Sequence, residues 1–306
     1  MPRGIIAPGA DGRADGRSFR YNVSVGIVTV GVRFRLAPRD PVPGSGGAPG
    51  VLLRLALAAE LAGADAVLVD GGRAPGTVAD PFVLLGALAA VTSRVVLGCV
   101  ATSVGERHPA ILAKTVAALD VCSAGRALAC LAPRAMPLET GLDELAEALD
   151  VVRTMLDRPA PSYAGRHFTI EGAWNEPRAA RVTPTPVGVL VPAAAATGNV
   201  ALASPGEFAS LAARHADCCF VEVSNGDART LRDVSRALAT TDIPVVALIG
   251  AAGDATPGDV ASAARRALGA PCRGVVVDWW QTPPAEAVAG VVAAVGRAVA
   301  GRSSTA

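Results

Sequence analysis

The fold is decided by the stretch HPAILAKTVAALDVCSAGR, residues 108–126, and by the apolar run RALACLAP, residues 126–133, directly behind it. The first part spaces its apolar residues as one helix face: Leu112, Val116 and Leu119. Pro109 suits the first turn of a helix, and Gly125 suits the exit from one. We therefore expect a helix that leads into a strand, with Gly125 turning the chain and Arg126 at the amino end of that strand.

The same alternation of an apolar run and a helical segment repeats along the chain. Predicted strands cover residues 23–30, 64–70, 94–102, 126–133, 186–193, 217–224, 243–250 and 273–280. Predicted helices cover residues 51–63, 80–93, 109–125, 141–157, 205–216, 227–240, 257–269 and 284–301. Continuous apolar strands are typical of parallel sheets covered on both faces, so eight such pairs predict a single-domain (β/α)8 TIM barrel. An open doubly wound sheet is the alternative, although no GxGxxG motif follows the first predicted strand.

The predicted barrel spans residues 21–302. Residues 1–20 carry Arg and Gly without the apolar core of a signal peptide, which predicts a flexible N-terminal tail. The Pro-rich stretch 159–186 interrupts the alternation and contains a candidate hairpin, YAGRHFTI, at residues 163–170. No unbroken apolar stretch reaches the ~18 residues of a membrane span, so we expect no membrane association.

Composition narrows the function classes. The net charge is +1 with both signs scattered along the chain, and no basic run is present, which argues against nucleic-acid binding. The six cysteines form no CxxC pair, and most lie in apolar runs, as small buried side chains do. This cysteine usage favours a reducing, cytoplasmic protein without zinc or another metal.

Active sites of TIM barrels lie at the carboxyl ends of the strands. The predicted strands place these candidates there: Thr29, Asp70, Cys99, Val100, Ala101, Thr102, Arg134, Thr197, Gly198, Asn199, Glu222, Ser224, Asn225, Asp278, Trp279 and Trp280. The single lysine, Lys114, lies within a predicted helix, which argues against a Schiff-base aldolase. No His lies at a strand end, which argues against a histidine-rich metal hydrolase.

Residues 80–126, DPFVLLGALAAVTSRVVLGCVATSVGERHPAILAKTVAALDVCSAGR, carry a family resemblance. They resemble the bacterial luciferase-like family of flavin- and deazaflavin-dependent oxidoreductases. The matching positions are Thr92, Arg94, Leu97, Gly98, His108, Pro109, Leu112, Ala113, Lys114, Leu119, Asp120, Ser123, Gly125 and Arg126. Upstream, AAELAGADAVLVDGG at residues 58–72 is similar to the family's pattern. Residues 163–198 and 211–222 look like the branch related to nitrilotriacetate monooxygenase.

The resemblance implies a monooxygenase that uses reduced FMN from a partner flavin reductase to oxidise a small organic substrate. A deazaflavin-dependent oxidoreductase is the close variant, and a homodimer or a heterodimer with a related barrel is expected. Cofactor-binding candidates are Asp70, Cys99, Val100, Ala101, Thr102, Arg134, Thr197, Gly198 and Asn199. We expect the flavin phosphate between the Arg134 loop and the loop at residues 193–199. The substrate-pocket candidates are Thr29, Trp279 and Trp280.

Four residues are catalytic candidates, each with a structural alternative. Asp70 contacts substrate or flavin, or it caps the following turn beside two glycines. His108 is a proton donor near the flavin or, as we favour, a helix-start residue with local hydrogen bonds. Glu222 and Asp278 form an acid–base pair, or they are two acids that meet strand ends by chance. Of Trp279 and Trp280, we expect at least one to pack under the final helix.

Several motif positions depart from the family's pattern. Residues 192–198, PAAAATG, replace the family's QAGSS, and Thr197 is the nearest hydroxyl to substitute for its serines. CLAPRAMP, residues 130–137, replaces a Gly-rich or Asn-Val-Val-Thr strand end, and Gly71 replaces a histidine. The alternative function is therefore a degenerate barrel without a cofactor, which serves as a non-catalytic partner subunit or a cofactor-free enzyme.

Overall fold

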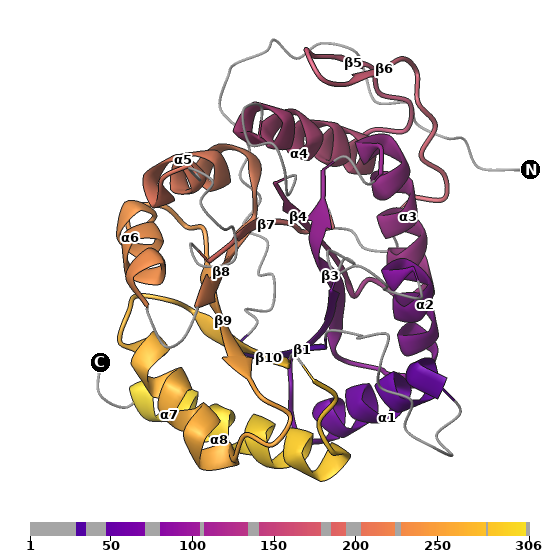
Figure 1. The fold of residues 1–306 in the computed structure, drawn as a ribbon. Helices are drawn as coiled ribbons and strands as arrows, with labels where there is room; N and C mark the ends of the chain where they lie inside the picture. The colour runs from indigo at the N-terminus through magenta and orange to yellow at the C-terminus, as the bar shows by residue number, and fades with distance from the viewer. Residues whose placement is uncertain are drawn as a thin grey trace, which may run out of the picture.

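Among the residues that the structure describes, eight parallel strands close into a barrel surrounded by eight helices (Figure 1). The structure is a computed structural model, and it describes residues 29–34, 47–70, 80–104, 107–133, 141–178, 185–193, 203–223, 228–279 and 281–303. The predicted TIM barrel is thus confirmed, and the open doubly wound sheet is excluded. Within the described residues, no helix is long and apolar enough to span a membrane.

The barrel strands are β1 (Val30–Phe34), β2 (Ala66–Asp70), β3 (Val96–Ser103), β4 (Ala127–Ala132), β7 (Val187–Val191), β8 (Cys218–Val223), β9 (Val245–Ala251) and β10 (Gly274–Trp279). They neighbour one another in this order, and β1 pairs with β10 to close the ring. Five of the eight lie within the predicted runs, and β3 and β9 extend one residue beyond theirs.

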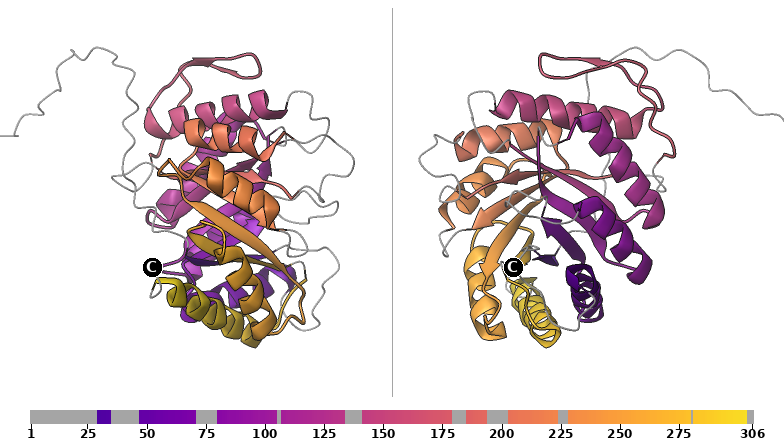
Figure 2. Two further views of the ribbon diagram at one scale, coloured as in Figure 1. Left: turned by 90° about the vertical axis from the view of Figure 1, so that its left-hand side faces the viewer. Right: turned by 45° about the vertical axis from the view of Figure 1, so that its right-hand side comes forward.

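The helices are α1 (Gly47–Leu61), α2 (Pro81–Val91), α3 (Pro109–Cys122), α4 (Gly141–Asp157), α5 (Pro205–His215), α6 (Arg229–Ala237), α7 (Pro257–Leu268) and α8 (Ala285–Ser303). The predicted hairpin is also present, as the antiparallel pair β5 (Tyr163–Ala164) and β6 (Thr169–Ile170). It lies outside α4, where Glu147 accepts hydrogen bonds from the backbone N–H groups of residues 166–168 (Figure 2).

The first strand was predicted too early. β1 begins at Val30, the last residue of the predicted run 23–30, and continues to Phe34. Its register against β10 pairs Val30 with Val275 and Phe34 with Trp279. Residues 23–28, like the predicted tail 1–20, lie outside the described residues. The later start brings an arginine, Arg33, into the wall of the barrel.

Side chains alternate between two apolar layers along each strand, as the pleat of a β-strand requires. Val30, Val32 and Phe34 belong to the outer core between strands and helices. A separate cluster fills the barrel interior: Ala66, Leu68, Val100, Leu128, Cys130, Ala132, Leu190, Cys218, Phe220, Val246, Leu248 and Val276. The same alternation turns the even-numbered residues of β2, β8 and β10 and the odd-numbered Arg33 of β1 toward the barrel axis.

The helix in the opening stretch begins and ends as its sequence predicts. The Nδ1 atom of His108 accepts a hydrogen bond from the backbone N–H of Ala110 at 3.2 Å, which caps the start of α3. Gly125 has φ of +86° and donates its N–H to the carbonyl of Asp120 at 2.8 Å, so it reverses the chain into β4. The interpretation of His108 as a helix-start residue is therefore confirmed.

Arg126 lies at the amino ends of the strands, as predicted. Its guanidinium donates to the carbonyls of Val95 and Thr92, at 2.9 and 3.0 Å, just before β3. Beside it, the carboxylate of Glu60 accepts the backbone N–H groups of residues 93–95 at 2.8–3.0 Å. These contacts hold the α2–β3 turn closed at the end of the barrel opposite to any site at the carboxyl ends.

The hydrogen bonds to Glu60 should make a measurable contribution to the pH dependence of stability. Burial raises the pKa of Glu60, but the N–H groups of Val95, Arg94 and Ser93 outweigh it and hold the pKa at about 2. Because the folded pKa lies below the ordinary 4.5, the stabilisation is complete above pH 4.5 and is lost as the pH falls toward 2. It corresponds to about 3 kcal/mol in the free energy of unfolding.

Urea denaturation of the wild type and Glu60→Gln between pH 7 and pH 3 measures this contribution. We expect the variant to be less stable at pH 7 and the two stabilities to converge toward pH 3. The side chain is buried, with 5% of its surface exposed, so solvent screens these hydrogen bonds little. Parallel curves for the two proteins over this range would assign the acid sensitivity to other carboxylates.

Candidate functional site

Four charged side chains meet inside the carboxyl end of the barrel. Arg33 of β1 lies at their centre, with 1% of its side-chain surface exposed. One Nη atom is 3.0 Å from a carboxylate oxygen of Asp70, the last residue of β2. The other is 3.2 Å from Glu222 of β8 and 3.4 Å from Asp278 of β10. We call these four residues the mouth cluster.

The mouth cluster keeps its arginine charged. Burial lowers the pKa of Arg33, but the carboxylates of Asp278, Asp70 and Glu222 together raise it above its ordinary value. A buried guanidinium without such partners would carry a large desolvation cost. The sequence has therefore placed three acids at strand ends that the closed barrel brings around one cation.

The three acids differ in their access to solvent. Asp70 and Glu222 retain 11% and 14% of their side-chain surface, whereas Asp278 retains 4%. Glu222 also accepts the backbone N–H of Ala193, just after β7, at 3.2 Å. Asp70 and Glu222 are thus the acids best placed to meet a ligand, and Asp278 mainly holds the arginine.

One donor of the cluster is left over. The Nε atom of Arg33 is buried and has no hydrogen-bond partner among the described residues. A buried polar group usually has a partner, so this N–H is a candidate contact for a ligand atom or an ordered water. The cluster as a whole offers a donor beside carboxylate acceptors, which suits a ligand edge that carries both kinds of group.

β3, which carries four of the predicted cofactor contacts, pairs with β2 beside this cluster. Val100 pairs with Asp70 across the strands and belongs to the barrel interior. Cys99 faces the outer core instead. Ala101 lies at a register shift against β4, and Thr102 continues the strand beyond it. Of the predicted cofactor contacts on β3, Val100 is therefore the one whose side chain is shown to face the barrel axis.

The other predicted site residues lie apart from the mouth cluster or outside the description. Thr29 was expected at a carboxyl end, but it precedes β1 and donates its N–H to Asp65, before β2, at 3.1 Å. It therefore lies at the amino end, where a substrate pocket gains no support. Trp279 is buried in the outer core and stacks on Phe34 with a centroid distance of 5.8 Å. Arg134, Thr197, Gly198, Asn199 and Trp280 lie outside the described residues, as do Ser224 and Asn225.

His108 follows β3 but is not shown to join the mouth cluster. Its side chain is exposed, and its ring contacts Phe168 edge-on at a centroid distance of 5.5 Å. Within the described part of the chain, no group of three His, Cys, Asp or Glu side chains is arranged to hold a metal ion.

The fold and the site together define a class of protein. A closed (β/α)8 barrel with ionisable side chains converging at the carboxyl ends of its strands has the architecture of an enzyme. Residues 32–290 match the family model described as luciferase-like monooxygenase, and the chain belongs to this family.

Solved structures support the fold at low sequence identity. The monooxygenase RslO1 from Streptomyces bottropensis is 18% identical, with a TM-score of 0.69, over 90% of this chain and 99% of that one. The coenzyme F420-dependent tetrahydromethanopterin reductase from Methanopyrus kandleri is 16% identical, with a TM-score of 0.67, over 88% and 99%. The oxygenating constituent of 3,6-diketocamphane monooxygenase from Pseudomonas putida, in complex with FMN, is 15% identical, with a TM-score of 0.52, over 72% and 66%. No curated protein sequence matches the chain closely enough to indicate a relationship.

Proposed function

We propose that the chain is an oxidoreductase that uses reduced flavin and molecular oxygen, the oxidant, to oxidise a small organic substrate at the mouth cluster. FMN supplied by a separate reductase is the first candidate, and an enzyme that transfers hydride with a deazaflavin is the close variant. Membership of the luciferase-like family supports a flavin or deazaflavin cofactor. One similar solved structure is a complex with FMN, and another is a coenzyme F420-dependent reductase. The proposed location of the active site rests on the convergence of Arg33 and three acids at the carboxyl ends of the strands.

The described residues fit the ring of a flavin. Its isoalloxazine edge has carbonyl and ring-nitrogen acceptors on both sides of one N–H donor. The unpartnered Nε–H of Arg33 could serve an acceptor, and the partly exposed carboxylates of Asp70 and Glu222 could serve the donor. A bound flavin would supply the electron transfer, and the protein would supply orientation and electrostatics.

The chain's own residues then have distinct roles in the proposal. Arg33 is a fixed positive charge that places a ligand's acceptor atom. Asp70 and Glu222 hold or exchange a proton, because they are the more exposed acids of the cluster. Asp278 keeps Arg33 in place, and the apolar layer beneath, with Leu68 and Phe220, keeps water from the floor of the site.

The phosphate of FMN needs donors that a ring site lacks. A dianion requires several N–H, hydroxyl or guanidinium groups, and Arg134 and Thr197 are the candidates after strands β4 and β7. If the phosphate lies between these two loops, Arg134→Ala and Thr197→Ala should each weaken FMN binding by ~1–3 kcal/mol. Fluorescence titration of FMN against each variant measures the loss, with Arg158→Ala as a surface-arginine control.

The cofactor proposal itself rests on a binding experiment. Purified protein is mixed with oxidised FMN, reduced FMN or a deazaflavin at ~100 μM, where a micromolar site would be nearly full. Retention through a desalting column, read by absorption, supports the proposal. If none of the three binds, the degenerate barrel, acting as a partner subunit or a cofactor-free enzyme, becomes the better account.

We further propose that the functional unit is a dimer in which two copies meet through α1, α2 and α3. These helices lie side by side (Figure 1) and carry exposed large apolar side chains: Leu57, Leu61, Val83, Val91, Ile111 and Val121. The sequence of α2, PFVLLGALAAV, contains no charged residue. A helix that is apolar all round is normally covered on every side, so this face favours a partner.

A charge on this face should split the dimer. Val83 is 70% exposed, so Val83→Glu costs the monomer fold little, but it would bury an unpaired carboxylate in the interface. Light scattering coupled to gel filtration should show a dimer for the wild type and a monomer for Val83→Glu. Arg232→Glu on α6 is the control. A wild type that stays monomeric at ~100 μM, or a variant that stays dimeric, would contradict this interface.

A further inference from the structure

A cavity of about 590 Å³ lies between the start of α6 and α7, outside β8 and β9. Its helix side is lined by small residues, Ala263 and Ala267 of α7 and Ala228 just before α6. Its apolar walls come from Val223, Ala228, Ile249, Ala251, Ala263 and Ala267. Most of these side chains are buried, so the cavity is set into the outer core. Its volume falls in the range of small-molecule sites.

Among the described residues that line this cavity, the polar groups lie at its two ends. Gly250 and Gln281 line it at the carboxyl ends of the strands, and Gly250 pairs with Asp278 of the mouth cluster. Arg266 lines it from the last turn of α7, which runs antiparallel to the strands, and so lies toward their amino ends. No described residue forms an ion pair with Arg266, and its side chain is exposed. The cavity is therefore an apolar channel with a cation at one end.

We propose that this cavity binds an amphipathic monocarboxylate of medium chain length. The carboxylate pairs with Arg266, and the aliphatic chain runs along the alanines of α7 toward Gly250. An apolar body excludes water from the walls, and a single anionic head matches the guanidinium. The site is separate from the proposed flavin site, and the proposal stands whether or not the chain binds a flavin.

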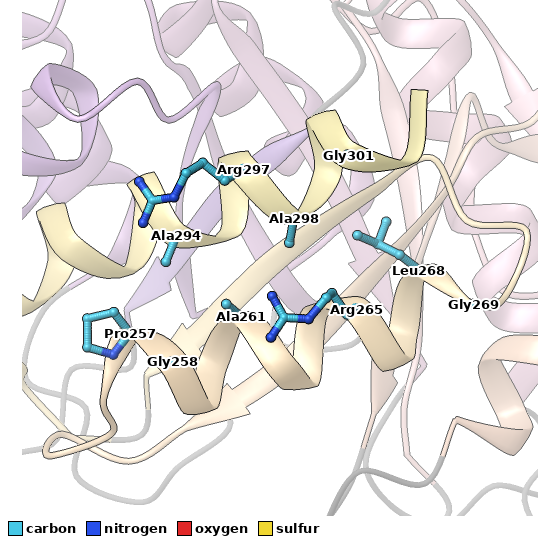
Figure 3. A pocket seen from close by; sticks show the side chains of 10 residues that line it. All are labelled: Pro257, Gly258, Ala261, Arg265, Leu268, Gly269, Ala294, Arg297, Ala298 and Gly301. Atoms are coloured by element: carbon cyan, nitrogen blue, oxygen red, sulfur yellow. The ribbon is translucent and has the colours of Figure 1, made fainter. Parts of the chain in front are cut away.

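A second hollow provides a demanding comparison. A groove of about 690 Å³ lies between α7 and α8, and it is lined by Arg265 of α7 and Arg297 of α8 together with alanines and glycines (Figure 3). Several of its lining residues are exposed, among them Pro257, Gly258 and Gly301. Its open walls would leave an aliphatic chain in water, which favours the α6–α7 cavity. The neighbouring arginines Arg265 and Arg266 thus line different hollows.

The test uses sodium octanoate and 1-octanol as probes in calorimetric titrations of the full chain. Octanoate should bind the wild type with one site per chain. Arg266→Gln should weaken octanoate about tenfold, the effect of one lost charge-assisted contact, and change octanol less than twofold. Arg265→Gln is the matched control and should change neither. Ala263→Phe fills the cavity and should abolish the binding of both probes.

Three results would overturn the assignment. One is the absence of saturable octanoate binding up to about 10 mM, a concentration at which even a site of millimolar affinity would be mostly filled. Another is an octanoate loss with Arg265→Gln that equals or exceeds the loss with Arg266→Gln, which would place the probe in the α7–α8 groove. The third is unchanged octanoate affinity in Arg266→Gln. If Ala263→Phe fails to fold, the two exposed arginine variants still decide, because neither side chain supports the core.

Discussion

Replacing Arg33 with methionine should destabilise the fold by about 3–5 kcal/mol at pH 7, because it leaves three carboxylates in the barrel without their cation. Arg33 is almost fully buried and contacts all three acids, so little water can replace the lost contacts. Urea unfolding at pH 7 measures the loss.

Two controls separate charge from volume in this experiment. Arg33→Lys keeps the positive charge but cannot span three carboxylates with one planar group, so its loss should be smaller than that of Arg33→Met. Adding Asp278→Asn to Arg33→Met removes one of the uncompensated charges and should recover part of the stability. A methionine variant as stable as the wild type would mean that other groups neutralise these acids.

The barrel could be predicted because the same pattern, an apolar run followed by a helical segment, repeats along the chain. Each of the runs at β2, β3, β4 and β7–β10 is a short apolar segment followed by a helix. Several of these helices have their own start signal, such as Asp80 and Pro81 at α2 and the capping box of Ser204 at α5. The first strand lacked this support. Residues 23–30 are richer in β-branched side chains than residues 30–34, so propensity alone favours the earlier run. Pairing with both β2 and β10 chooses the later segment, and those contacts are distant in sequence.

The three acids of the mouth cluster were predicted as site residues, but its arginine was not. Asp70, Glu222 and Asp278 follow apolar runs, and the rule that barrel sites lie at carboxyl ends was sufficient to select them. Arg33 was not among the predicted site residues, because the first strand was predicted to end at Val30. The available signal was the sequence VGVRF, in which an arginine stands between valine and phenylalanine at an inward position. Three acids at the carboxyl ends of one barrel also indicate a neighbouring cation, because buried carboxylates are normally paired.

The second large effect concerns catalysis under the proposed function. Glu222 is the most exposed acid of the mouth cluster and already accepts the N–H of Ala193, so its carboxylate is held in place for proton exchange. Glu222→Gln keeps the shape and an acceptor oxygen but removes the ionisable group. We expect the turnover number to fall ~100- to 10,000-fold, the usual contribution of a general acid or base, and flavin affinity to change little.

The measurement is single-turnover product formation after pre-reduced flavin and protein are mixed with oxygenated buffer and whichever member of a panel of small organic compounds supports turnover. Glu207→Gln is the matched control, because glutamine can also complete the capping box of α5, far from the proposed chemistry. A proton-transfer role predicts that the variant also loses the pH dependence that the wild-type rate shows. If the rate falls less than threefold with an unchanged pH profile, Glu222 only supports Arg33, and Asp70 becomes the acid to test, since it is the other partly exposed carboxylate on the guanidinium.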